Sequence, residues 1–337
     1  MPPLFNIPKS QLQYTGESVY CSASNLLRRC NREQNPVDRF IYVVAWFIST
    51  RRRMTFGVAP YNPILGETHH VSKGNLNVLV EQVSHHPPVT ALHATDDKEN
   101  IEMIWSQQPV PKFYASATPL CNNPRAPSRR SWICHLTIFS TSSLVEFRGN
   151  RTTYPGVQIR VQFIPNTNCA SDPKVRGSIP TEGKNSTREG GGEDRTSVEA
   201  KVNGKGKLKL LNHGETYEMD SANLLYKVFP VPSVDWVGTV NLRCLETCLV
   251  AELCFKSSPS FLGLGGNHKV IKGKIFDSSS SKILYELDGQ WDRIVKLKDR
   301  INGEVRVIYD ATKANSWLQS PILKNEEVII HYMYHMQ

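Results

Sequence analysis

Short stretches in which apolar and polar residues alternate dominate this chain, and they constrain its fold more than any other feature. Such stretches lie at 76–83, 207–210, 249–256, 283–291 and 304–309. Alternation over runs of this length is typical of half-buried β-strands. Turn-forming pairs such as Asn203-Gly204 and Asn302-Gly303 separate them, which predicts an antiparallel meander. A meander this long must close or split to hide its edges, so we expect a large β-barrel with helices at one end, a fold that commonly holds an apolar ligand.

Two helices are predicted ahead of these strands. The stronger one starts at Asn35-Pro36, with Asn35 as the N-cap and Asp38 in the first turn, and runs to about Arg51. Its interior is apolar nearly all round, so we expect it to be buried, and the arginines 51–53 suit the negative end of its dipole. A shorter helix is expected around 23–31. Residues 1–20 mix apolar and turn residues, which indicates a short packed arm or a mobile flap.

Membrane spans and disulfides are not expected. The longest apolar run, Ile41–Ile48, is less than half of the ~18–20 residues that a spanning helix needs. The first residues lack the basic and apolar regions of a secretory signal, so we expect a cytosolic protein. None of the eight cysteines forms a CxxC pair, and cytosolic thiols stay reduced.

The net charge of +9 is concentrated in one part of the chain. Residues 115–195 carry +5 of it, from two Lys and nine Arg against two Asp and four Glu. No recognisable DNA- or RNA-binding module surrounds these arginines, so nucleic acid is not an expected partner. The segment ends in low-complexity sequence of linker type.

A His-His-Pro-Pro sequence at 85–88 closes the stretch predicted as a strand from Leu76 to Val83. Proline cannot donate a ladder hydrogen bond, so the strand must end there with His85 and His86 at its rim. Two imidazoles at a barrel mouth can donate to an anion such as a phosphate monoester, which titrates in the same pH range. The alternative, that both are core or turn residues bonded to backbone, stays open on the residues alone.

Zinc hydrolysis is the rival interpretation of this region. Five histidines lie between positions 69 and 93, with Glu67 and Glu81 nearby, and three-His or His-His-Glu sets are typical of catalytic zinc. However, HExxH, GxSxG and the phosphate-binding GxxxxGK[ST] are all absent. A binding role is therefore favoured over an enzyme, with no catalytic residue and no metal ligand assigned. His69 and His70 are interpreted as solvated strand residues.

Two motifs resemble those of a known family. EQVSHHPPVTA at 81–91 and NPILGE at 62–67 are similar to the signatures of the oxysterol-binding protein-related family. The stretches KLLNHGETY (209–217), VDWVG (234–238) and LYELDGQWDR (284–293) resemble its short plant members. The resemblance covers about 5–114 and 196–324.

The resemblance implies a near-complete antiparallel β-barrel around a hydrophobic tunnel, with an N-terminal lid and flanking helices. It implies a lipid carrier that holds one sterol, or alternatively phosphatidylinositol 4-phosphate, and moves it between membranes. In such a carrier His85, His86 and Asn62 would hold the phosphate headgroup. The apolar face of the lid would be formed by Phe5, Ile7, Leu12 and Tyr14. We expect a monomer without cofactor that contacts intracellular membranes, such as the endoplasmic reticulum, peripherally.

Three departures from the family pattern affect this expectation. Ala59 stands where the family usually has a headgroup lysine. The tail 325–337 no longer resembles the family, whose C-terminal helices are missing. Residues 115–195 have no counterpart, and they interrupt a lipid-binding domain predicted at 1–324. A genuine loop insertion and translated non-coding sequence both stay open as origins; a genuine insertion is expected to contain one hairpin around Cys134–Ile164.

Overall fold

The computed structural model describes residues 6–21, 24–57, 59, 62–113, 132–139, 153–154, 157–165, 197–227, 233–257 and 269–314. The chain divides into two compact units, one of residues 1–113 and 197–337 and the other of residues 114–196. In the second unit β5 (Trp132–Phe139), β7 (Val157–Pro165) and β6 (Thr153–Tyr154) form a small antiparallel sheet. Cys134 lies opposite Phe163 in it, which confirms the hairpin predicted there.

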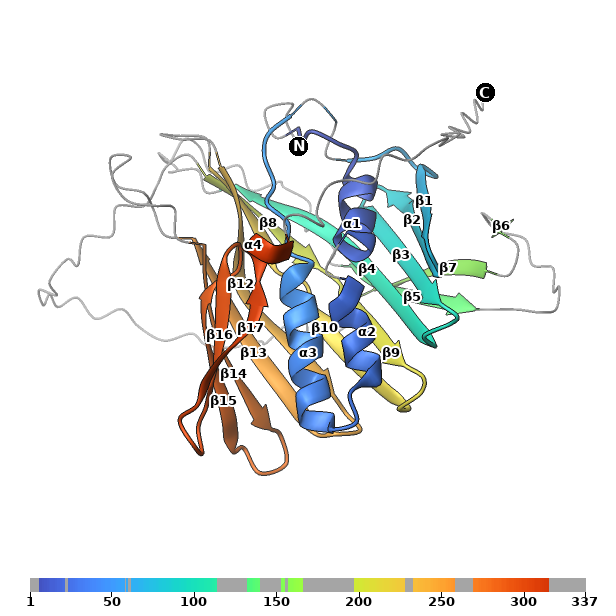
Figure 1. The fold of residues 1–337 in the computed structure, drawn as a ribbon. Helices are drawn as coiled ribbons and strands as arrows, with labels where there is room; N and C mark the ends of the chain where they lie inside the picture. The colour runs from blue at the N-terminus through green and yellow to red at the C-terminus, as the bar shows by residue number, and fades with distance from the viewer. Residues whose placement is uncertain are drawn as a thin grey trace, which may run out of the picture. The chain divides into compact units, whose positions relative to one another are not determined.

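The first unit consists of a large sheet and a few helices (Figure 1). Its helices are α1 (Gln11–Tyr20), α2 (Ser24–Arg32), α3 (Pro36–Ser49) and the short α4 (Ala311–Ala314). Its strands are β1 (Thr68–Lys73), β2 (Leu76–His85), β3 (Pro88–Asp96), β4 (Ile101–Phe113), β8 (Ser197–Asn203), β9 (Lys205–Leu210), β10 (Glu215–Asp220), β11 (Asn223–Lys227), β12 (Ser233–Cys244), β13 (Leu249–Ser257), β14 (Lys269–Asp277), β15 (Ile283–Gln290), β16 (Ile294–Asp299) and β17 (Val305–Asp310). Of the helices described, none is long and apolar enough to cross a membrane.

The fourteen strands form one antiparallel sheet in which most neighbours in the sequence pair with each other; among the described strands β8 and β9, and β10 and β11, do not. Two strands of the sheet are interrupted. β8 and β9 form one of them, and both pair with β4. β11 and β10 form the other, with β11 paired to β8 and β10 paired to β9. Gly204 stands at the first interruption, because a Cβ there would lie 2.0 Å from the Ser106 carbonyl oxygen. The predicted meander is thus confirmed as a large curved sheet. Within the described residues β1 and β17 do not pair, and the near-complete barrel stays a prediction.

Helix α3 is the apolar centre of the first unit. It begins where the sequence predicts, because the Asn35 side chain accepts hydrogen bonds from the Val37 and Asp38 amides at 2.9 and 3.3 Å. Phe40, Trp46 and Phe47 are fully buried in one cluster with side chains of the sheet. In Figure 1 α2 and α3 lie next to each other against the sheet. The prediction of a helix buried on most sides is confirmed.

Helix α1 was not predicted as a helix. Residues 11–20 contain glycine and β-branched residues, which lower helix propensity, so the sequence favoured an arm or a flap. Ser10 caps the helix by accepting from the Leu12 amide. The helix lies against β1, β2 and β3, and Leu12 is fully buried. Packing against the sheet therefore stabilises a segment of weak intrinsic propensity.

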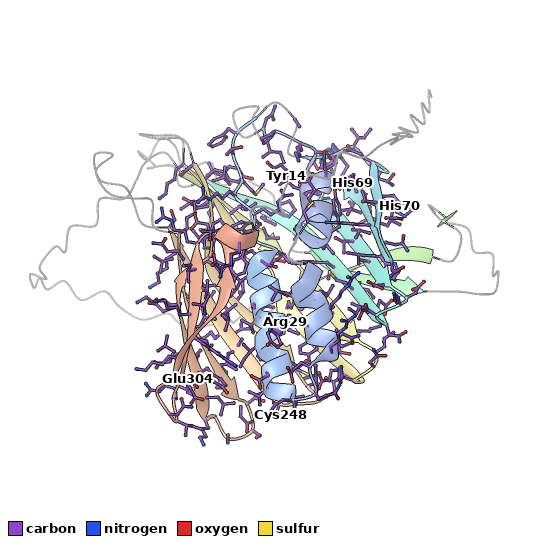
Figure 2. The ribbon with its side chains drawn as sticks, viewed as in Figure 1. Tyr14, Arg29, His69, His70, Cys248 and Glu304 are labelled. Carbon is purple, nitrogen blue, oxygen red and sulfur yellow. The ribbon has the colours of Figure 1, made fainter. Side chains whose placement is uncertain are left out.

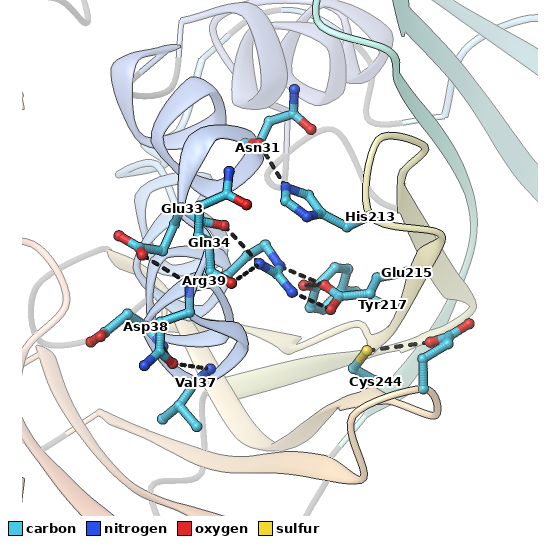
Figure 3. A network of polar contacts seen from close by, with 12 residues as sticks. Asn31, Glu33, Gln34, Val37, Asp38, Arg39, His213, Glu215, Tyr217 and Cys244 are labelled. Carbon is cyan, nitrogen blue, oxygen red and sulfur yellow. Dashed lines mark hydrogen bonds and ion pairs between the residues drawn. The ribbon is translucent and has the colours of Figure 1, made fainter.

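A buried ion pair joins the first turn of α3 to the sheet (Figure 3). Arg39 donates to both carboxylate oxygens of Glu215 on β10, with Nε 2.7 Å from Oε2, and to the carbonyl oxygens of Glu33 and Gln34. The Tyr217 hydroxyl donates to the same carboxylate. Burial would raise the pKa of Glu215, but the hydrogen bonds from Arg39 and Tyr217 outweigh it and hold that pKa below its usual value.

Candidate functional site

The paired histidines lie at a hairpin between two strands. β2 ends at His85 and β3 begins at Pro88, opposite His85 in the register. The pairing shifts between Gln82 and Ser84, so the end of β2 is irregular before the turn. The prediction that the strand ends at these residues is confirmed, although the chain returns at once as the next strand.

The two imidazole rings lie side by side at this turn. Their centroids are 4.4 Å apart and the rings meet edge to face. His86 is exposed and His85 is half-buried, so neither is a core residue. His85 Nδ1 lies 2.8 Å from the Pro63 carbonyl oxygen, to which it must donate. Its Nε2 is therefore the nitrogen left for another partner, and the turn is joined to the segment that contains Asn62.

Asn62 belongs to a chain of polar contacts that leads inward from this turn. Its Oδ1 accepts from Gln82 Nε2 at 3.0 Å. The Gln82 Oε1 lies 2.8 Å from the Thr90 hydroxyl, which lies 2.9 Å from Oε1 of Gln11 on α1. Gln82, Thr90 and Gln11 are buried. Sequence reasoning missed these three residues, because isolated glutamines and threonines in strands and helices have no motif to distinguish them.

Helix α1 is held over the sheet at this place by polar contacts and by one close approach. The Ser10 hydroxyl donates to Glu67 of the NPILGE segment at 2.6 Å. Glu17 accepts from Lys9 at 2.8 Å and is paired with Arg52, which follows α3. A Cβ at Gly16 would lie 2.8 Å from a ring carbon of His69, so glycine permits the close contact between α1 and β1.

A pocket lies between α1, the segment after α3 and the sheet. Its walls include Gln11 and Tyr14 of α1, Arg51, Trp105 of β4, Leu224 of β11 and Trp236 of β12. The space between these walls amounts to about 640 Å³, open solvent at its mouth included. Its lining of aromatic and aliphatic side chains with a few polar groups is of the kind that binds small molecules. Gln11 connects the pocket wall to the contact chain from Asn62.

Arg51 lies in this wall and has no ion-pair partner among the residues that the structure describes. α3 ends at Ser49, two residues before its predicted end, and Arg51 is buried with only 5% of its surface exposed. Its Nε and Nη2 have no hydrogen-bond partner among the described residues. Its Cζ lies 4.3, 5.4 and 5.0 Å from the ring centroids of Phe47, Trp105 and Trp236. Burial lowers the pKa of Arg51 to about 9, so it stays charged at neutral pH.

The four residues predicted to form the apolar face of a lid occupy different places. Phe5 lies outside the described residues. Ile7 is buried and its backbone pairs with that of Ala59, with N–O distances of 3.0 and 2.8 Å. Leu12 packs in the main core, and Tyr14 lines the pocket. Their contact with a ligand stays a prediction, and Tyr14 is the one that the pocket favours.

The remaining histidines of the 69–93 region lie apart from the pair at 85–86. His69 on β1 is half-buried, with its Nε2 3.1 Å from the Tyr20 hydroxyl, and burial lowers its pKa. The interpretation of His69 as a solvated residue is therefore wrong, whereas His70 is exposed (Figure 2). His93 lies 3.2 Å from Glu102. In the part of the chain that is described, no three His, Cys, Asp or Glu residues are grouped to hold a metal ion.

Comparison with known proteins agrees with the motifs of this site. The family model described as oxysterol-binding protein matches residues 1–122 and 194–335, which include the NPILGE and His-His-Pro-Pro segments. The chain belongs to the oxysterol-binding protein family. It is 38% identical to the oxysterol-binding protein-related proteins 4C and 4B of Arabidopsis thaliana, over 96% and 98% of its length. It spans 65% and 66% of the length of these two relatives.

Solved structures share the fold of this family member. The Osh1 ORD domain in complex with ergosterol matches with a TM-score of 0.56 at 18% identity, over 92% of this chain and 56% of that one. The Osh3 ORD in complex with PI(4)P from Saccharomyces cerevisiae matches with a TM-score of 0.53 at 17% identity, over 94% and 64%. These matches show the same mainly antiparallel fold.

Proposed function

We propose that this chain binds one sterol or one phosphatidylinositol 4-phosphate at a time and transfers them between membranes without catalysing a reaction. Solved structures of similar fold support both ligands, since the Osh1 domain was solved with ergosterol and with cholesterol and the Osh3 domain with PI(4)P. We further propose that the large sheet wraps into a near-complete barrel over residues 1–324, interrupted by 115–195.

One observation carries this proposal: the histidine turn and the pocket are connected. Asn62 beside the turn, Gln82 and Thr90 in the strands, and Gln11 in the pocket wall form a continuous chain of contacts of 2.8–3.0 Å. An amphipathic lipid needs polar partners for its headgroup next to an apolar space for its tail. The chain of contacts runs from the turn through β2 and β3 to α1, and α1 forms one wall of the pocket.

The histidine turn suits a phosphate headgroup. His85 Nδ1 donates to the Pro63 carbonyl, so His85 can donate to an anion through Nε2 when its ring is protonated, and the exposed ring of His86 can also donate. Imidazole and a phosphate monoester titrate in the same pH range, so each favours the charged form of the other. The Asn62 amide, which accepts from Gln82 through its oxygen, has its NH₂ group to donate.

The pocket suits an apolar body. Sterol surface removed from water contributes about 25 cal/mol per Å², so a carrier needs an enclosed apolar space. α1 and the residues before it act as the lid in this proposal, and Tyr14 faces the ligand. Two ligands that exclude each other load according to their abundance in the donor membrane, which is exchange by mass action.

Contact with membranes is proposed to be peripheral. Ile64 and Leu65 of the NPILGE turn are exposed, at 53% and 60%, beside the carbonyl of Pro63 that binds His85. Apolar side chains at an exposed turn can enter the interfacial region of a bilayer. We propose that a monomer acts there, in the cytosol and at membranes such as the endoplasmic reticulum.

The test replaces His85 and His86 by alanine and measures extraction of both lipids from liposomes. We expect extraction of phosphatidylinositol 4-phosphate to be abolished and extraction of sterol to stay largely intact. His70→Ala is the matched control, because His70 is an exposed histidine on the neighbouring strand β1. Equal loss of both activities in the double variant would contradict the headgroup role and assign the pair to folding.

A further inference from the structure

Arg51 is buried in a pocket wall, stacked on aromatic rings and without a carboxylate partner among the described residues. It lines the space under α1, and two of its three guanidinium nitrogens have no hydrogen-bond partner among the described residues. Buried guanidinium groups normally reach a carboxylate or carbonyl oxygen, because unpaired charged donors are costly to remove from water. A charged group of this kind in a pocket has donors that an oxygen of a ligand can accept from.

The described protein groups around Arg51 include no acidic partner for it. Trp105 and Trp236 present their ring faces to its guanidinium and donate their own indole N–H groups elsewhere, to Ser221 and to the Arg52 carbonyl. Aromatic faces attract a cation but accept none of its directed hydrogen bonds. Glu17, the acidic residue of α1, is paired with Arg52 and Lys9.

We infer that Arg51 binds the carboxylate of an apolar acid in the pocket under α1. A guanidinium donates two parallel hydrogen bonds to a carboxylate and neutralises its charge. A sterol hydroxyl can accept one bond and brings no charge, so it leaves the cation uncompensated. The ligand class is an amphipathic monocarboxylic acid, either a fatty acid or an acid derived from a sterol.

This inference rests on the proposed function in one respect, that an apolar ligand occupies the pocket under α1. It adds a preference for a ligand with a carboxylate group, which the binding of sterol and phosphoinositide does not require. The apolar walls, including Leu224, Trp105 and Trp236, would contact the body of the acid, and Arg51 would contact its head. The stacked rings fix the guanidinium in place, so little ordering is needed when the acid binds.

The test compares three fluorescent probes: cis-parinaric acid, its methyl ester and dehydroergosterol. Binding is measured at about pH 7, where carboxylates are ionised. The wild type is expected to bind the acid about tenfold or more tightly than the ester, the range of a charge-assisted hydrogen bond. Arg51→Met is expected to remove that preference, so that the acid and the ester bind to it with affinities within about twofold of each other.

Arg53→Met is the matched control, because Arg53 lies two residues further on, is exposed and pairs with Asp292 at 2.8 Å. It is expected to keep the preference for the acid. Arg51→Gln, which keeps donors but loses the charge, is expected to lie between Arg51→Met and the wild type. Circular dichroism and thermal melting establish that each variant is folded.

The outcomes separate this inference from the proposed function. Sterol binding without a preference for the acid would overturn the inference and leave the proposed function standing. A preference for the acid that persists in Arg51→Met would also overturn it, because another group would then hold the carboxylate. Absence of binding by all three probes to the wild type would overturn both.

Discussion

Two arginines flank helix α3, and they are equally buried but differently partnered. Arg39 lies in its first turn and Arg51 two residues after its end, and each has 5% of its surface exposed. Arg39 donates to Glu215 and to two carbonyl oxygens, and the hydrogen bond with Glu215 raises its pKa. Arg51 faces three aromatic rings, has no carboxylate partner in the described part of the chain, and burial lowers its pKa to about 9.

The difference teaches that burial alone does not show what a charged side chain does. A buried cation with a matched anion positions the elements that carry the two groups, here α3 and β10. A buried cation without one destabilises the fold, and a ligand that supplies the missing anion offsets that cost. Arg39 is therefore assigned to architecture, and Arg51 to the pocket.

The largest expected effect on stability comes from replacing Arg39, the arginine that is paired with a carboxylate. Arg39→Met leaves the Glu215 carboxylate buried without its cation and is expected to lower the free energy of unfolding by about 3–5 kcal/mol. Urea denaturation followed by tryptophan fluorescence measures it. The triple variant Arg39→Met, Glu215→Leu, Tyr217→Phe removes the whole buried group and should regain most of the loss. A triple variant as unstable as Arg39→Met would contradict this reasoning.

A smaller effect on stability, of opposite sign, is expected from replacing Arg51. Arg51→Met replaces an unpartnered charge by an apolar side chain of similar length and should raise the free energy of unfolding of the ligand-free protein by about 1–3 kcal/mol. The same denaturation experiment measures it, with exposed Arg53→Met as the control. A clear loss of stability would show that stacking on Phe47, Trp105 and Trp236 outweighs the desolvation of the charge.

The smallest effect on stability is expected from lowering the pH. The pKa of Glu215 is lowered in the folded state, so its contribution is fully present above its unfolded value of 4.5 and is lost as the pH falls through the folded-state value. Melting temperature is therefore expected to fall more steeply in the wild type than in the triple variant below about pH 4.5. Parallel curves for the two proteins would show that other carboxylates, such as Glu17 and Glu102, dominate acid unfolding.

Sequence patterns predicted those helices and strands that interactions between neighbouring residues determine. The Asn35 cap and the apolar run after it predicted α3, and period-two alternation predicted the meander. The proline pair predicted the end of β2 at the histidines. Helix α1 was missed because its propensity is weak and contact with β1–β3 stabilises it. Gln11, Gln82 and Thr90 were missed because their contacts join residues that no motif relates.

The sequence by itself determined the family, the antiparallel meander and the end of a strand at His85 and His86, since caps, turns and alternation act over a few residues. Only the tertiary structure decided which of the two arginines has a carboxylate partner. The carboxylate that pairs with Arg39 lies 176 residues further along the chain, whereas Arg51 has no carboxylate partner among the described residues. Electrostatic partners are set by distance in space and by exclusion of water, and neither quantity is written in the spacing of residues along the chain.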